Sequence, residues 1–520
     1  MIPPREACIA AVASRDARFD GVFYTGVIST GIFCRPSCPA MTPRPANLTF
    51  HPSAAAATAD GFRACRRCRP DATPGSPEWD IRADTAGRAL RLIADGAVDR
   101  GGISGLAAHL GYSPRQLERL TRAEMGASPL ALARTQRAVT ARILVETTDL
   151  PFSDVAFAAG FGSIRSFNDT IRTVFAATPF QLRARRPRRH LSPASGPSST
   201  PTAELTVRLP VRLPWDPEQS FAHLVATAVP GIEEWTGTHY RRTLRLPRGP
   251  GIVSIAPRET YAEATFHLTD LRDLQAATAR TRRMLDLDAD PAAVADHLGR
   301  DPHLAASVAA SPGRRIPRSA DGSEMALRAV LGQQVSTAAA RTHTARIVER
   351  LGDPLPHPDG TLTHLFPTPE VIAEADLPGL PAGRAATLRA LANALAEGTI
   401  DVGPGADRAE TRARLAELPG IGPWTVELVA MRALGDPDAF PATDLGVIRG
   451  AANLGIPGAT ARELIASAER WRPWRSYAVQ YLWAAHEHPT NHLPVGTPSA
   501  SSGTPSRKSD APSREGRMNT

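Results

Sequence analysis

Four of the five cysteines in this 520-residue chain stand in two close pairs. Cys34 and Cys38 are separated by three residues, Cys65 and Cys68 by two, and a longer segment lies between the pairs. This spacing is typical of a tetrahedral zinc site with four thiolate ligands. Two disulfides are the alternative, but residues 1–10 lack the apolar segment of a signal peptide, which favours a reducing cytoplasm. We therefore predict one Zn2+ ion bound by all four cysteines.

Arginines surround both cysteine pairs, within residues 33–39 and 62–70. Their guanidinium groups offset part of the charge of a tetrathiolate and can bind phosphate oxygens. One interpretation is a small DNA-binding module stapled by zinc; the other is a zinc thiolate that attacks an electrophile on the DNA backbone. The chain here resembles the N-terminal domain of the Ada alkylation-response proteins, in the segments Phe23-Tyr24-Thr25-Gly26-Val27, Thr30-Gly31-Ile32-Phe33-Cys34-Arg35-Pro36-Ser37-Cys38-Pro39 and Cys65-Arg66-Arg67-Cys68. The resemblance implies that Cys34, besides binding zinc, accepts a methyl group from a DNA methylphosphotriester.

A carboxylate in the C-terminal half is the second candidate centre. Residues 418–423 predict a tight hairpin that opens a helix, in which Gly420 and Gly422 let backbone N–H groups approach a DNA phosphate. Asp444 follows some twenty residues later, directly after turn residues that include proline. The hairpin, the Gly/Pro segment and the aspartate together resemble the helix-hairpin-helix DNA glycosylases. A closer likeness to the AlkA 3-methyladenine glycosylases rests on residues 418–427, 431–435 and 470–478.

Asp444 is the predicted catalytic residue of that centre. Cleavage of an N-glycosidic bond builds positive charge on the sugar, and a nearby carboxylate stabilises that charge or prepares a water molecule to capture it. Alkylated purines such as 3-methyladenine are already cationic, so the leaving base needs little acid assistance. The alternative role for an aspartate after a turn is a helix N-cap.

The AlkA resemblance implies roles for three more residues. Trp424 and Trp483 correspond to positions that line the base pocket, where aromatic faces stack on an electron-poor flipped base; packing in the core is the alternative for either. Trp424 also stands where strand-nicking relatives carry a Schiff-base lysine, which implies a monofunctional enzyme that leaves an abasic site. Gln334 matches the wedge that fills the gap left by the flipped nucleotide, or is a polar loop residue. Leu428 replaces a tyrosine typical of the pocket.

Two segments between these centres predict helix-turn-helix units. In each, a helix and a glycine turn lead to a capping serine, Ser113 or Ser163, and a second helix. Two segments with the same spacing are stronger evidence for this motif than a single match. The region resembles the AraC family of transcription activators. Its second helices are expected to enter major grooves of DNA, although a helical bundle with a solvated arginine face is the alternative. The predicted DNA-contacting residues are Arg115, Arg119, Arg165, Asn168 and Arg172.

The length of the chain and its segments rich in proline, glycine and serine predict several domains. A chain of 520 residues is too long for one core, its net charge of +8 favours a polyanionic partner, and no apolar run is long enough for a membrane span. The predicted fold is multidomain α+β and mostly α. Its parts are a zinc-binding α/β module at 1–78, an AraC-type double helix-turn-helix at 80–186, a flexible linker at 187–203, an AlkA N-terminal-like α+β domain with a small antiparallel sheet at 204–285, an all-α helix-hairpin-helix glycosylase domain at 286–487, and a disordered tail at 488–520.

These patterns predict a fused alkylation-damage protein that works in the cytoplasm as a monomer. Its expected partners are alkylated and promoter double-stranded DNA, and RNA polymerase. No cysteine follows Cys68, so the O6-methylguanine methyl transfer of full-length Ada proteins should be absent. The alternatives are a transcription factor whose C-terminal half is a degenerate DNA clamp, and a repair enzyme whose helix-turn-helix pair only holds DNA.

Overall fold

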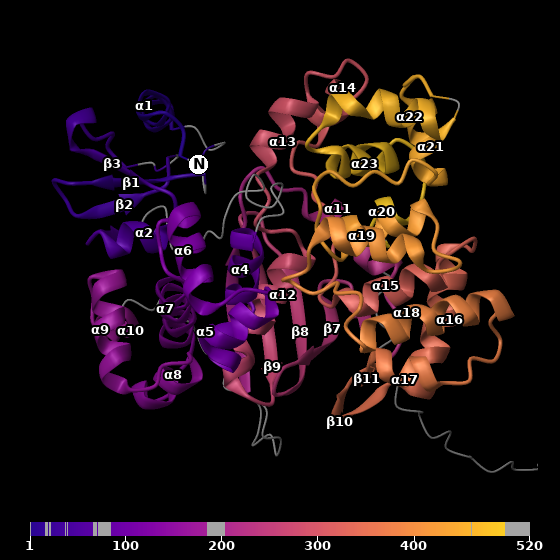
Figure 1. Ribbon diagram of the computed structural model, residues 1–520, viewed down its shortest axis with the longest axis horizontal. Coiled ribbons are helices and arrows are strands. Elements are labelled where there is room, and N and C mark those ends of the chain that lie inside the picture. The colour runs from indigo at the N-terminus through magenta and orange to yellow at the C-terminus, as the bar shows by residue number, and fades with distance from the viewer. Residues whose placement is uncertain are drawn as a thin grey trace, which may run out of the picture.

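The computed structural model describes residues 2–15, 19, 22–36, 38, 40–65, 70, 85–184, 203–458 and 460–494 (Figure 1). A small sheet module comes first along the chain, followed by a helical region of residues 85–184, which we call the reader region. A domain with a five-stranded sheet and a large helical domain come after it. Within the described residues, no helix is both long and apolar enough to cross a membrane. The predictions for Cys68, residues 187–202 and residues 495–520 lie outside the described part of the chain.

The N-terminal module is built on a four-stranded sheet in the order β3-β1-β2-β4. β1 pairs antiparallel with β2 and β3, while β2 and β4 run parallel. A small apolar cluster that includes Phe23, Val27 and Leu48 packs against the first helix. The elements are α1 (Arg5–Ser14), β1 (Tyr24–Val27), β2 (Ile32–Cys34), β3 (Leu48–His51), α2 (Ala54–Ala59) and β4 (Arg63–Ala64).

The reader region has the two predicted helix-turn-helix units. The Ser113 side chain accepts from Gln116 N–H while the Gln116 side chain accepts from Ser113 N–H, and Ser163 caps the corresponding later helix by accepting from Ser166 N–H. The elements are α4 (Thr85–Ala94), α5 (Ala97–His109), α6 (Pro114–Met125), α7 (Pro129–Thr147), α8 (Phe152–Ala158), α9 (Ile164–Phe175) and α10 (Pro179–Ala184).

The predicted small antiparallel sheet is confirmed and has five strands. Its order is β5-β9-β8-β7-β6, and β9 alternates strictly between buried and partly exposed residues. The elements are β5 (Ala203–Pro210), α11 (Pro217–Ala226), β6 (Glu233–Trp235), β7 (Tyr240–Leu246), β8 (Gly249–Pro257), β9 (Tyr261–Leu268) and α12 (Leu274–Met284).

The C-terminal domain is helical apart from one hairpin that the sequence analysis did not anticipate. Prolines at 354, 356 and 358 argue against a strand, but a two-stranded ribbon tolerates them because unpaired edge N–H groups are not needed. The hairpin is β10 (Asp353–Asp359) and β11 (Leu362–Leu365). The helices are α13 (Pro291–Leu298), α14 (Ala305–Ala310), α15 (Gly322–Leu331), α16 (Thr337–Leu351), α17 (Pro369–Glu374), α18 (Ala382–Ala396), α19 (Arg408–Glu417), α20 (Pro423–Arg432), α21 (Leu445–Asn453), α22 (Ala461–Ala468) and α23 (Arg475–Ala484).

The first residues of the predicted disordered tail are ordered in the structure. The short 3-10 helix Pro489–Asn491 packs against α11. The Asn491 side-chain amide donates to the backbone carbonyls of Trp483 and His486, at 3.0 and 2.8 Å. These bonds satisfy carbonyls at the end of α23, so the chain holds its order past residue 487.

The reader region docks directly onto the C-terminal half of the chain, residues 203–494. Arg88 and Arg91 of α4 each donate from Nε at 2.6 Å to a carbonyl of the loop before α19, those of Gly405 and Pro404. Asp95, only 3 % exposed, lies 3.1 Å from Arg280 of α12. Helices α7 to α10 also share one apolar cluster with the five-stranded sheet. The helical region of residues 85–184 and the C-terminal half therefore pack against each other through both polar and apolar contacts.

Candidate functional sites

Local pairing of two short strands assembles the cysteine centre. Cys34 ends β2, and Cys65 directly follows β4, its parallel neighbour. The Cys65 N–H donates to the Phe33 carbonyl at 2.9 Å, which extends the pairing to the ligand itself. Cys38 enters through a turn in which its N–H donates to the Arg35 carbonyl at 3.1 Å.

The donor set of this centre fits zinc. The Sγ atoms of Cys34, Cys38 and Cys65 all lie within 4.8 Å of one another. Cys38 and Cys65 are 3.8 Å apart at Sγ, and a tetrahedron with Zn–S bonds of about 2.3 Å has an edge of about 3.8 Å. Three thiol sulfurs so placed suit a tetrahedral zinc ion and leave one position for a fourth ligand. The predicted fourth ligand, Cys68, is outside the described residues.

Exposure separates the cysteines from one another. Cys38 and Cys65 are 9 % and 8 % exposed, whereas Cys34 is partly exposed and is the most accessible of the three. Cys8 is fully buried, and burial raises the pKa of its thiol to about 11. Cys8 is thus a poor nucleophile at neutral pH.

Two tryptophans converge on the predicted catalytic carboxylate. Trp424 Nε1 donates to Asp444 Oδ2 at 2.8 Å, and Trp483 Nε1 donates to Asp444 Oδ1 at 2.9 Å. The indoles come from α20 and α23, and both also pack against the main apolar core of the domain. Core packing was the alternative role for each tryptophan, and the structure shows both indoles packed on the core while they hold Asp444. Their place in a base pocket stays a prediction.

The same carboxylate caps the helix that follows it. Asp444 Oδ1 accepts from the Val447 N–H at 3.0 Å, so the N-cap role is also real. With the two indoles this makes three hydrogen bonds to a group that has about four acceptor positions. A Cβ on Gly446 would lie 2.9 Å from Trp483 and 3.1 Å from Asp444 Oδ1, so glycine lets these groups close together. The carboxylate is held in one orientation with capacity left for one further partner.

The predicted hairpin has the expected backbone. Gly420 has a φ of +84°, and a Cβ there would lie 2.0 Å from Thr387 Oγ1, so this position requires glycine. Gly422 is the N-cap of α20 and has open space around it. Gln333, which the sequence analysis passed over, donates to the Gly420 carbonyl at 3.0 Å and to Thr425 Oγ1 at 2.9 Å. Nothing in the local sequence marks a glutamine that bridges two distant loops.

Gln334 projects from that bridged loop. Its side chain is exposed, and its φ is +54°, a left-handed conformation that non-glycine residues rarely adopt. Strain of this kind persists where the surrounding structure demands it, and it is common at ligand-binding segments. Its use as a wedge remains a prediction.

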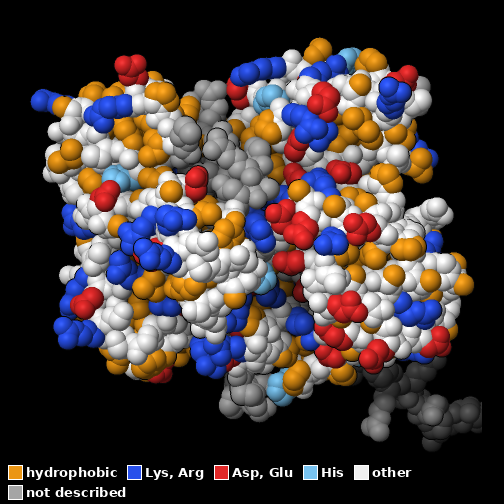
Figure 2. Space-filling view, viewed as in Figure 1, with side chains coloured by type: hydrophobic (Ala, Val, Ile, Leu, Met, Phe, Trp, Pro, Cys, Tyr) orange, Lys and Arg blue, Asp and Glu red, His pale blue; other side chains and the backbone are white. Residues whose placement is uncertain are grey.

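The predicted DNA-contacting side chains are accessible on the two second helices of the reader. Arg115 and Arg119 on α6, and Arg165 and Arg172 on α9, are exposed, while Asn168 is partly exposed. Asp169 lies 4.0 and 3.9 Å from the two arginines of α9, as weak, solvated pairs. Basic side chains gather over α6 on the face in Figure 2, whereas acidic ones are scattered over the C-terminal half.

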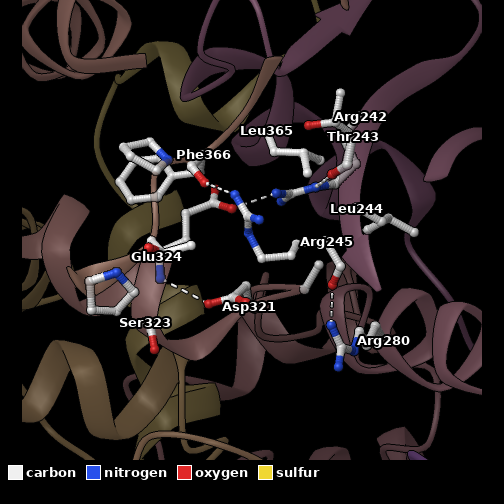
Figure 3. Close-up of a pocket in the computed structure, with 14 residues that line it drawn as sticks. Arg242, Thr243, Leu244, Arg245, Arg280, Asp321, Ser323, Glu324, Leu365 and Phe366 are labelled. Atoms are coloured by element: carbon white, nitrogen blue, oxygen red, sulfur yellow. Dashed lines mark hydrogen bonds and ion pairs between the residues drawn. The ribbon is translucent and has the colours of Figure 1, made fainter. Parts of the chain in front are cut away.

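A separate cleft of about 90 Å³ lies between β7, α12, the start of α15 and the end of β11 (Figure 3). Its arginines have partners within the protein: Arg242 contacts Glu324 at 2.6 Å, and Arg245 donates to the Phe366 backbone carbonyl at 2.9 Å. Arg280, which also lines it, contacts Asp95 of the reader. The cleft is therefore part of the frame that joins sheet, reader and helical domain, and it is apart from Asp444.

Models of known families match four consecutive parts of the chain. They are the metal binding domain of Ada at residues 7–71, a helix-turn-helix domain at 106–185, the AlkA N-terminal domain at 206–321 and the HhH-GPD superfamily base excision DNA repair protein at 327–476. The geometry and these models define a zinc-binding and DNA-binding regulator fused to a DNA glycosylase.

Relatives extend this result over most of the chain. The chain is 55% identical over 492 residues to the "Probable bifunctional transcriptional activator/DNA repair enzyme AlkA" of Mycobacterium tuberculosis, covering 94% of this chain and 98% of the relative. It is 34% identical over 282 residues to "DNA-3-methyladenine glycosylase 2" of Escherichia coli, covering 52% of this chain and 95% of the relative. It is 37% identical over 128 residues to "Bifunctional transcriptional activator/DNA repair enzyme Ada" of Escherichia coli, covering 25% of this chain and 35% of the relative. The chain belongs to the family of AlkA-type bifunctional transcriptional activators and DNA repair enzymes.

Proposed function

We propose that this protein couples the detection of methylated DNA to the removal of alkylated bases. The methyl acceptor is Cys34, the reader is the tandem helix-turn-helix region, and the enzyme is a monofunctional glycosylase of the DNA-3-methyladenine glycosylase II type. The observation that supports the enzyme most directly is the convergence of two indole N–H groups on the carboxylate of Asp444.

Methyl transfer at Cys34 is a displacement at carbon. Bound zinc keeps the four thiols deprotonated at neutral pH. The Cys34 Sγ attacks the methyl carbon of a DNA methylphosphotriester, an S–C bond forms, and the electron pair of the broken C–O bond leaves on the phosphate oxygen as an ordinary phosphodiester. The thioether product is stable, so each molecule repairs one lesion. The greater exposure of Cys34 supports its choice among the ligands.

The same reaction switches DNA affinity. Replacing one thiolate by a thioether changes the charge of the four-cysteine cluster from about −2 to about −1 without removing the scaffold. Repulsion of DNA phosphates falls, the reading helices bind promoter DNA more tightly, and the bound protein engages RNA polymerase. Because two reading heads lie in one chain, a monomer suffices.

At the second centre, Asp444 acts on the sugar of a flipped alkylpurine. As the C1′–N bond breaks, its electron pair goes to the base, and the carboxylate stabilises the positive charge on the sugar. Water then adds to C1′, and Asp444 takes its proton. The position of the strand-nicking lysine is occupied by Trp424, whose indole N–H holds the carboxylate instead, so the product is an abasic site.

Release of 3-methyladenine from alkylated duplex DNA tests the enzyme. Asp444→Asn retains an oxygen that can cap α21, so the fold should survive while release falls by about 10²–10³-fold. Equal release by wild type and variant, or none by either, would contradict the assignment.

Mass spectrometry after incubation with methylated DNA tests the acceptor. One added methyl group is expected on Cys34, and none on Cys8. Promoter binding measured before and after that reaction tests the switch, since unchanged affinity would leave only repair.

A further inference from the structure

A histidine of the sheet domain lies against the carboxylate centre. His223 on α11 stacks on Trp483, with ring centroids 6.2 Å apart and ring planes inclined by 17°. Trp483 in turn donates its N–H to Asp444. An imidazole from the sheet domain thus lies against the indole that holds the Asp444 carboxylate.

The ring of His223 has an unused hydrogen-bonding atom. Its Nε2 is buried and has no hydrogen-bond partner in the described part of the chain. The same is true of Nδ1 of His486, whose ring and Asp444 Oδ1 would both lie 3.1 Å from a Cβ on Gly446. A buried polar atom without a partner costs roughly 1–3 kcal/mol, so two of them beside one site leave hydrogen-bonding capacity that a bound base could use.

The electrostatic surroundings keep this imidazole uncharged. Burial, together with the positive charges of Arg432 and Arg328 and the neighbouring His488, holds the pKa of His223 well below its ordinary value. A neutral imidazole offers one donor and one acceptor nitrogen. It also avoids the repulsion that an imidazolium would exert on a cationic alkylpurine.

We propose that His223 is a specificity-determining residue whose Nε2 hydrogen-bonds the edge of the flipped base. This role rests on the proposed glycosylase function and deepens it, because it makes one class of leaving base preferred over another. A merely space-filling ring would serve all bases alike, whereas a hydrogen bond favours those bases that present a complementary group at the same edge position.

The test uses full-length protein and single-turnover release of 3-methyladenine, 7-methylguanine and hypoxanthine, which differ in the groups on their edges. His223→Phe keeps the aromatic ring and removes the hydrogen bond, and we expect the ratios of the three rates to shift by about tenfold. His223→Gln, which restores a hydrogen-bonding group, should recover part of the wild-type ratios. The matched control is His357→Phe on exposed β10, which should change no ratio.

The possible failures can be told apart. Equal changes in all three rates with His223→Phe, or no change in any, would overturn the specificity role alone. If the wild type releases none of the three bases, the proposed function fails and this role fails with it. Thermal unfolding of His223→Phe near the wild-type temperature shows that a changed ratio does not come from a misfolded variant.

Discussion

The cysteine centre and the carboxylate centre are built by opposite means. All described ligands of the first lie between Cys34 and Cys65, in a module whose apolar clusters are small. The second gathers Trp424, Asp444 and Trp483 from three helices, with His223 from another domain, against the largest apolar core of the protein. Small modules bury too little apolar surface to be stable alone, and a metal supplies the missing free energy. The first centre therefore depends on its metal ion for stability, and the second depends on the packing of the core around it.

Removal of zinc should separate the two centres most strongly. Structural zinc contributes about 10–16 kcal/mol in small zinc peptides, so a chelator or Cys38→Ser should unfold the N-terminal module and abolish methyl transfer. Base release should stay within about twofold of wild type, because no ligand of zinc belongs to the core around Asp444. Parallel loss of both activities on chelation would show that the centres are not independent.

Loss of Asp95 should weaken the docking of the reader region on the domain that frames the second centre. In Asp95→Ala, the buried Arg280 and Arg283 of α12 lose the carboxylate that lies 3.1 and 3.9 Å away. Breaking such a buried pair costs about 3–5 kcal/mol, and the reader should undock, which small-angle scattering would record as a larger radius of gyration. Asp99→Ala breaks the pair with Arg137 inside the reader and is the matched control, with no expected change in radius.

The acidity of Asp286 should make the second centre, and not the first, sensitive to pH in one window. Burial raises the pKa of this carboxyl from 3.8 to about 6, and the Tyr477 hydroxyl at the start of α23 donates to it. The folded state therefore binds more protons between pH 4 and 6, and the stability contributed by this group is present below pH 4 and lost as pH rises through about 6. Two pKa units correspond to about 3 kcal/mol.

Asp286→Asn should remove that dependence. Relative to wild type, the variant should gain up to about 3 kcal/mol of unfolding free energy when the pH is raised from 4 to 7, measured on the glycosylase transition in urea. Asp288→Asn, which affects a more exposed pair with Arg282, serves for comparison. A difference between wild type and Asp286→Asn that does not vary with pH would contradict the assigned cause.

The smallest effect should come from one indole hydrogen bond. Trp483→Phe keeps an aromatic face and removes the donor to Asp444 Oδ1, so base release should fall by about tenfold to a hundredfold, as for a hydrogen bond to a charged group. Trp471→Phe removes a similar bond, 2.7 Å long, to Asp301 away from the site. It should lower the unfolding temperature without changing the rate of release; a similar loss of rate in both variants would mean that Trp483 acts only through the fold.

What the sequence could predict follows the range of the interactions. Cysteine spacing, serine caps and strand alternation act over a few residues, so the zinc site, the paired reading helices and the small sheet could be anticipated. The contact of His223 with Trp483 could not be predicted, because a histidine on an amphipathic helix gives no sign of a partner more than two hundred residues away. The hydrogen bonds of Gln333 were missed for the same reason. β10 was missed because its prolines argue against a strand, although an edge strand tolerates proline.

Docking of the reader on the helical domain has a consequence for geometry on DNA. A duplex turns once in about 10.5 base pairs, so each base faces a given side of the helix only at intervals of that length. With α4 held to the loop before α19 and to α12, the angle between the reading helices and the base pocket is set by the protein. If both engage one duplex, only bases at a certain helical phase from the bound site can enter the pocket, and damage elsewhere must be reached by a molecule that has left its promoter.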